Sequence, residues 1–214
     1  ALWEMGVRDL RVPLDDLADP ATRKRMTELA ALGHRFTAYT YGLPKGGARD
    51  ALVEHGSILA AWEVVAPTVG IAGLLAGIAD LKGEIPVFFN ASRVFAESFS
   101  SSHGLQADER GAVEAVLALK GARAAIDGVV FGIARDEAPA QAIETACRSV
   151  EGLGVKAAVH VQFAHRRPLD PEESERADAN RIAESVVGAM AHGDVTVFLD
   201  NFTGIDRGYY FCGG

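Results

Sequence analysis

The sequence predicts an alternating α/β fold, a (β/α)8 barrel of the TIM type, from three observations. First, an amphipathic stretch, a glycine and a short apolar run recur along the chain as one module. Second, the apolar runs lack a polar face, as parallel strands of α/β proteins do. Third, no Gly-rich phosphate-binding sequence follows the first run, where the chain reads Arg-Val-Pro-Leu-Asp-Asp. This favours a closed barrel over an open doubly wound sheet.

Each expected helix is an amphipathic stretch closed by a glycine, because glycine after a helix adopts the left-handed conformation without strain. The expected helices, each with its closing glycine, are Thr27–Leu32 with Gly33, Arg49–His55 with Gly56, Gly70–Lys82 with Gly83, Ala138–Leu153 with Gly154, and Ala177–His192 with Gly193.

Seven apolar runs are the expected strands: Val7–Val12, Phe36–Tyr41, Ile58–Val65, Ile85–Asn90, Gly128–Ala134, Val155–Gln162 and Val195–Asp200. A (β/α)8 barrel has one strand more, and no eighth helix follows Asp200. Two interpretations follow: the first strand and the last helix are missing from this chain, or the barrel is unusually reduced. No linker or low-complexity tract divides residues 1–214, so we expect a single domain.

Composition and charge narrow the expected partners. With 49% hydrophobic, 23% charged and 7% aromatic residues, the chain is an ordinary globular mixture. Its 29 acidic and 21 basic residues give a net charge of −8, so we expect no nucleic-acid partner. The longest apolar stretch, 58–79, contains a glutamate, a proline and a glycine, so we expect no membrane partner. Cys147 and Cys212 have no metal-type spacing, which fits a reduced, cytoplasmic compartment. The sequence leaves the oligomeric state open.

Polar side chains stand in otherwise apolar strands, toward the ends where the active sites of (β/α)8 barrels lie. Side chains alternate along a strand with period two, so Asp9 and Arg11 share a face, as do His160 and Gln162. An unpaired polar group there would cost about 1–3 kcal/mol, so we expect bonds among these groups, to water or to a ligand. The candidate ligand-binding residues in the strands are Arg11, Tyr39, Tyr41, Asn90 and Gln162.

Glu63, His160 and Asp200 are the candidates for catalysis. Glu63 lies in the run Ala-Ala-Trp-Glu-Val-Val, where burial would raise its pKa unless a cation such as Arg11 lies close. Structural alternatives exist for these polar residues. The tyrosines could serve packing, His160 could bind a backbone carbonyl, and Asp9 and Arg11 could form an ion pair.

The C-terminal run Asp200–Tyr209 carries acids, a base and aromatics directly after the last expected strand. This mixture is typical of sites that recognise polyhydroxylated ligands by hydrogen bonds and ring stacking. The candidate ligand-binding residues of the run are Asn201, Asp206, Arg207 and Tyr209. In the structural alternative, Asp206 and Arg207 form a surface pair and Asp200 caps a turn.

The run Phe198–Phe202, followed by Gly208 and Tyr209, resembles the eighth strand and its loop in clan A glycoside hydrolases, especially retaining β-glucosidases. Other segments resemble the family in the same chain order. Met5–Val12 resembles its second strand, in which an arginine occupies the place of Arg11. Tyr39–Pro44 resembles its third strand and the loop after it, and Trp62–Pro67 resembles its fourth strand. The resemblance implies a TIM-type barrel with a carbohydrate ligand. It begins at strand two, which accounts for the missing strand.

The resemblance does not extend to the catalytic pair. Retaining glycosidases need two carboxyl groups about 5–5.5 Å apart, one as acid and one as nucleophile. In the fourth strand the family has a Trp-Asn-Glu-Pro type of sequence, but here apolar residues surround Val65 and Ala66, and Glu63 is out of register. The seventh strand, Val159–Phe163, has no acid, and the amide of Gln162 cannot be a nucleophile. The resemblance therefore does not imply retaining activity.

Three functions remain open. The first is a glycoside-hydrolase-like barrel that binds or processes a glycan or another small molecule, without the standard retaining mechanism and without a cofactor. The second is a sugar isomerase or epimerase in which Glu63, Asn90, His160 and Asp200 hold Mn²⁺, Mg²⁺ or Zn²⁺. The third is a noncatalytic interaction protein on a degenerate barrel.

Overall fold

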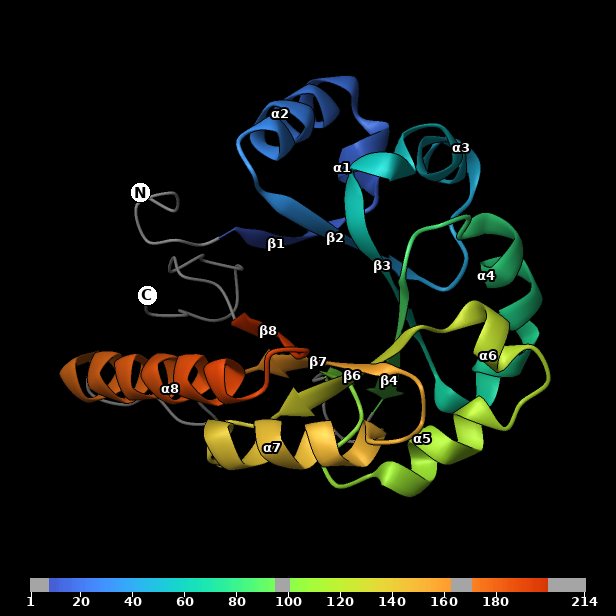
Figure 1. Cartoon of the computed structure of the whole chain (residues 1–214). Helices are drawn as coiled ribbons and strands as arrows, with labels where there is room; N and C mark the ends of the chain where they lie inside the picture. The colour runs from blue at the N-terminus through green and yellow to red at the C-terminus, as the bar shows by residue number, and fades with distance from the viewer. Residues whose placement is uncertain (1–7, 95–100, 163–170, 200–214) are drawn as a thin grey trace. The chain divides into compact units, whose positions relative to one another are not determined.

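Figure 1 shows the computed structural model of the chain, which describes residues 8–94, 101–162 and 171–199. The chain forms two compact units. Unit 1 comprises residues 1–101 and 114–128, and unit 2 comprises residues 102–113 and 129–214. The assignment of residues 1–214 to a single domain stays a prediction.

Unit 1 is built on the parallel strands β1 (Asp9–Pro13), β2 (Arg35–Tyr41), β3 (Leu59–Ala66) and β4 (Val87–Val94). Each matches an expected apolar run to within a few residues. The helical segments of the unit are α1 (Asp15–Ala18), α2 (Pro20–Ala31), α3 (Gly46–His55), η1 (Gly56–Ile58), η2 (Thr68–Gly73), α4 (Leu75–Leu81) and α6 (Ala122–Ala125). In Figure 1, α1 to α4 lie on one side of β1 to β3.

Unit 2 contains β6 (Gly128–Ile133) from its second residue on, α7 (Pro139–Val150), β7 (Lys156–Val161), α8 (Pro171–Ala191) and β8 (Thr196–Leu199), with β7 and β8 parallel. Helices α7 and α8 lie side by side (Figure 1). They cross so closely that a Cβ atom at Gly188 would lie 3.0 Å from Ile143 Cδ1. The sequence did not predict β5 (Ser101–His103), α5 (Arg110–Leu117) or the short helices α1 and α6.

The strand order is β1-β2-β3-β4-β6-β7-β8, and β5 pairs with β4 beside this path. The strands therefore follow one another in chain order, with helices between them, and the order never reverses. An open doubly wound sheet reverses its strand order at a switch point, whereas a (β/α)8 barrel does not. The predicted fold class is confirmed: this is a TIM-type α/β fold with seven of the barrel strands.

One face of the unit 1 sheet, here called the apolar face, carries large buried side chains. Phe36, Trp62 and Phe89 are each at most 2% exposed. The indole of Trp62 is satisfied, because its Nε1 donates to Thr40 Oγ1 at 2.9 Å. The Thr40 hydroxyl in turn donates to the carbonyl of Gly42 at 2.8 Å. The opposite face, here called the polar face, carries the candidate residues of unit 1, which are Arg11, Tyr39, Tyr41, Glu63 and Asn90.

Strands β2 and β3 pair with a shift in register. Phe36 pairs with Leu59, but the next residue, Thr37, pairs with Ala61. Ala60 is the extra residue, is exposed, and forms a β-bulge. The ladder is regular beyond it and places Tyr39 opposite Glu63.

The glycines that were expected to close helices act in different ways. Gly33 has φ +90°, and a Schellman motif closes α2, with the Gly33 amide donating to Ala30 and the His34 amide to Leu29. Gly56, by contrast, has φ −58° and begins η1. A Cβ atom there would lie 2.5 Å from Ile85 Cδ1, so Ile85 would have to shift to admit a side chain at this position.

Candidate functional site

The polar face of unit 1 arranges the candidate residues in rows across the strands. Tyr39 of β2 and Glu63 of β3 stand opposite each other in one row. The next row toward the carboxyl ends of the strands holds Tyr41 and Asn90, and the row on the amino-terminal side holds Arg11. Because cross-strand neighbours share a face, these five side chains start from the same side of the sheet.

Arg11 and Glu63 form a bidentate ion pair. The Arg11 Nε donates to Glu63 Oε2 at 2.8 Å, and Nη2 donates to Glu63 Oε1 at 2.7 Å. The Glu63 side chain is 1% exposed and that of Arg11 is 25% exposed. Arg11, the cation that the sequence indicated as a possible neighbour of Glu63, is therefore in contact with its carboxylate.

Asn90 approaches Glu63 from the row above and is fully buried. Its Nδ2 donates to Glu63 Oε1 at 2.5 Å, which fixes the orientation of the amide. Its other polar atom, Oδ1, is buried and accepts no hydrogen bond within the part of the chain that the structure describes. An acceptor without a donor costs about 1–3 kcal/mol when buried, so this oxygen lowers the net stabilisation that the cluster provides.

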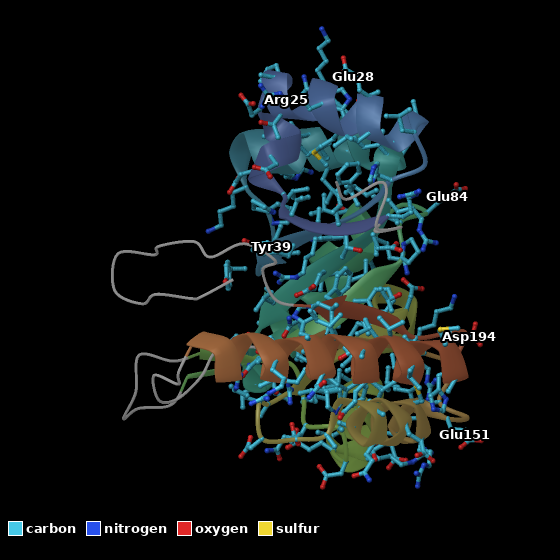
Figure 2. The ribbon with its side chains drawn as sticks, turned by 90° about the vertical axis from the view of Figure 1, so that its left-hand side faces the viewer. Arg25, Glu28, Tyr39, Glu84, Glu151 and Asp194 are labelled. Carbon is cyan, nitrogen blue, oxygen red and sulfur yellow. The ribbon has the colours of Figure 1, made fainter. Side chains whose placement is uncertain are left out.

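The two tyrosines extend the cluster toward the carboxyl end of β2. The Arg11 guanidinium carbon lies 4.0 Å from the centre of the Tyr39 ring, a cation–π contact (Figure 2 labels Tyr39). Tyr41 meets Tyr39 edge to face, with ring centres 6.0 Å apart and an interplanar angle of 87°. Tyr41 itself is 70% exposed, so it is not a core packing residue.

The expected alternative of an Asp9–Arg11 ion pair is wrong. Asp9 pairs instead with Arg35 of the neighbouring strand at 2.7 Å, an exposed contact whose hydrogen bond and charge raise the pKa of Arg35. Arg11 turns toward Glu63. The alternation of side chains along β1 correctly predicted that Asp9 and Arg11 share a face. Their ion-pair partners, however, depend on how β1 is aligned with the neighbouring strands.

This arrangement constrains what Glu63 can do. Both carboxylate oxygens accept hydrogen bonds, two from Arg11 and one from Asn90. In this geometry Glu63 orients Arg11 and Asn90.

Unit 2 carries two further candidates. His160 of β7 meets the ring of Phe198 on β8 edge to face, with centres 5.4 Å apart. Gln162 follows β7, and its backbone amide donates to the carbonyl of Ile133 at 3.1 Å. The remaining candidates, Asp200, Asn201, Asp206, Arg207 and Tyr209, lie outside the described residues.

A cluster in unit 2 was not predicted. Arg181 of α8 donates to the carbonyls of the loop after β6, at Ala134, Arg135 and Glu137, over distances of 2.6–2.9 Å. Arg135 lies 3.0 Å from Asp178. Burial lowers the pKa of Arg181, and the like charge of Arg135 lowers it further. These contacts hold the loop at the carboxyl end of β6 against α8. In the sequence, the i, i+3 spacing of Asp178 and Arg181 indicates only that the two side chains share one face of the helix.

Two other features are absent from the described residues. Among them, no group of three or more His, Cys, Asp and Glu side chains is placed to hold a metal ion. Of the metal ligands expected in the isomerase alternative, Asp200 lies outside this part of the chain. No described helix is both long and apolar enough to span a membrane.

Comparisons with known proteins bear on the fold. No protein-family model and no curated protein matches the sequence. Among solved structures, a psychrophilic family 10 endo-β-1,4-xylanase is similar with a TM-score of 0.53 and 10% identity, over 91% of this chain and 87% of the other. An intracellular xylanase from Thermoanaerobacterium saccharolyticum, in complex with xylotetraose, is similar with a TM-score of 0.55 and 11% identity, over 84% and 69% of the two chains. Both likenesses support the barrel fold.

Proposed function

We propose that this chain is a glycoside-hydrolase-like barrel that binds a carbohydrate and does not use the standard retaining mechanism. The observation that carries the proposal is the Arg11–Glu63–Asn90 cluster at 2.5–2.8 Å. It fixes polar groups on one face of the sheet, and it occupies both oxygens of Glu63, which the sequence indicated as a candidate for catalysis. The likeness of the fold to xylanases supports the ligand class.

In this proposal Glu63 is a positioning residue. It holds the Arg11 guanidinium through Nε and Nη2, so that Nη1 keeps its hydrogens for a ligand oxygen. It also holds the buried Asn90 amide through Nδ2. A sugar hydroxyl can accept the hydrogen bond that Nη1 of Arg11 offers.

Any chemistry would fall to groups other than Glu63. His160, and Asp200 at the end of β8, are the proposed candidates, with Gln162, Asn201, Asp206, Arg207 and Tyr209 as proposed ligand-binding residues. A cytoplasmic location belongs to the same proposal and rests on the cysteine pattern. Titration of two free thiols in native protein prepared without reductant would support it, and a disulfide would contradict it.

Calorimetric titration with neutral oligosaccharides, together with hydrolysis assays on aryl glycosides, tests the proposal. We expect saturable binding of at least one oligosaccharide at a Kd below about 1 mM. Arg11→Gln should weaken it, whereas Arg35→Gln, which removes an arginine from an exposed ion pair, should not. If a glycan array and the aryl glycosides both give no signal with folded protein, the proposed function is wrong.

A further inference from the structure

Helix α8 of unit 2 carries an apolar stripe on its exposed side. Val186, Val187 and Met190 are 47%, 64% and 80% exposed, although they stand within five residues of one another. Ala179 and Ala183, also exposed, extend the stripe toward the start of the helix, because residues three and four apart share a helix face. Single exposed apolar side chains are ordinary, but a contiguous set marks an interaction surface. These five residues are here called the α8 stripe.

The α8 stripe is the side of the helix that unit 2 does not use for its own packing. Ser185 and Gly188 are buried, and Gly188 approaches Ile143 of α7. With about 3.6 residues per turn, the stripe is centred roughly opposite this packed side. Residues 200–214, which follow β8, are a poor source of a covering helix, because four of them are glycines.

Opposite charges border the two ends of the stripe. Arg176 lies three residues before Ala179, and Asp194 lies beyond the end of the helix at Ala191 (Figure 2 labels Asp194). Both charged residues are exposed, and neither forms an ion pair with another described residue. The stripe therefore runs from a cation to an anion.

A second copy of the chain in antiparallel orientation complements this pattern. Ser185 is midway between Arg176 and Asp194 in the sequence, so a two-fold axis at its level sets Arg176 of each copy beside Asp194 of the other. The same axis brings Met190 to a level between Ala179 and Ala183, where a long, flexible side chain meets two small ones. A parallel arrangement would instead place like charges side by side.

We propose that the α8 stripe is the interface of a homodimer, in which two α8 helices pack antiparallel and Arg176 of each copy pairs with Asp194 of the other. This inference goes beyond the proposed function and does not depend on it. Stable interfaces use about 20–30 residues a side, so a stripe of this size predicts a weak dimer, with a Kd above about 1 µM.

Sedimentation equilibrium of the full chain, from about 10 µM to about 1 mM, tests the proposal. The mean mass should rise with concentration from that of one chain toward that of two. Val187→Asp should weaken dimerisation at least about tenfold, because it places a charge in the interface without a partner. Val53→Asp is the matched control, since Val53 of α3 is 62% exposed and the change of charge is the same; the Kd should not change. Circular dichroism checks that both variants are folded.

Charge reversal tests the antiparallel orientation. Arg176→Asp and Asp194→Arg should each weaken dimerisation by roughly threefold to tenfold, because each replaces two ion pairs by like-charge contacts. The two substitutions together should restore the affinity of the parent protein. A chain that stays monomeric up to about 1 mM overturns the proposal, whatever else covers the stripe. An equal effect of Val187→Asp and Val53→Asp, or a double charge reversal that restores nothing, also overturns it.

Discussion

Replacing Glu63 by glutamine tests whether the buried cluster is an ionic one. The substitution keeps the shape of the side chain but removes the charge that three hydrogen bonds share, two from Arg11 and one from Asn90. It also turns an amide N–H toward a neighbouring donor. A charge-assisted hydrogen bond exceeds a neutral one by roughly 1 kcal/mol, so the three together are worth about 3 kcal/mol.

The exposure of Arg11 adjusts this magnitude. Breaking a fully buried pair costs about 3–5 kcal/mol, because the remaining charge has no solvent. The Arg11 side chain is 25% exposed, so water can partly solvate the guanidinium. We therefore expect Glu63→Gln to lower the free energy of unfolding of unit 1 by about 2–4 kcal/mol.

Urea unfolding followed by the fluorescence of Trp62, in a Trp3→Phe background, measures this loss, since Trp62 is buried next to Glu63 in unit 1. Asp9→Asn is the matched control, because it breaks an exposed ion pair and should cost less than about 1 kcal/mol. Adding Arg11→Met to Glu63→Gln should recover stability, since no unpaired charge then remains. A Glu63→Gln loss no larger than that of Asp9→Asn would refute the reasoning.

Three further outcomes are expected. Gly56→Ala should destabilise the protein by about 1–3 kcal/mol in urea unfolding, and Ile85→Val, which removes the atom 2.5 Å from the new Cβ, should restore part of it; no recovery would contradict the packing role. Asp19→Ala should lower the thermal midpoint at pH 7, because the Asp19 carboxylate accepts from the Thr22 amide at the start of α2, and the hydrogen bonds of the Thr22 side chain and of its amide lower the pKa of Asp19. A lowered folded-state pKa stabilises the fold above the unfolded value of 3.8, so the difference between parent and variant should vanish as the pH falls through the folded pKa; a difference independent of pH would contradict this. Arg181→Met should speed amide hydrogen exchange in residues 134–137, which lose three hydrogen bonds to their carbonyls, and unchanged exchange there would count against the fastening.

Strands β3 and β6 were predictable because they bury residues at nearly every position, almost all of them apolar. The run around Trp62 and the run around Phe89 needed no further information. Strand β5, Ser101–His103, was missed because its residues are polar and give no hydrophobic signal. The first half of α2 was also missed, although Asp19 caps it and Pro20 stands at its first position.

The candidate site was predictable in composition but not in pairing. Period-two parity placed Arg11 with Asp9 and Tyr39 with Tyr41 on shared faces. The partners across strands depend on register, and register here includes a bulge that no period-two pattern contains. The sequence indicated which residues face one side of the sheet and named Arg11 as a possible partner of Glu63, but the choice between Asp9 and Glu63 as that partner needed the register.

The bulge at Ala60 also bears on how this strand can vary in length. A chain that lost Ala60 would still pair Phe36 with Leu59 and Thr37 with Ala61, now in an unbroken ladder. Glu63 would keep its place opposite Tyr39. The strand can thus lose a residue at its amino-terminal end without moving the ion pair, so an alignment gap at Ala60 would be structurally neutral. A gap beside Glu63 would instead turn the carboxylate toward the apolar face.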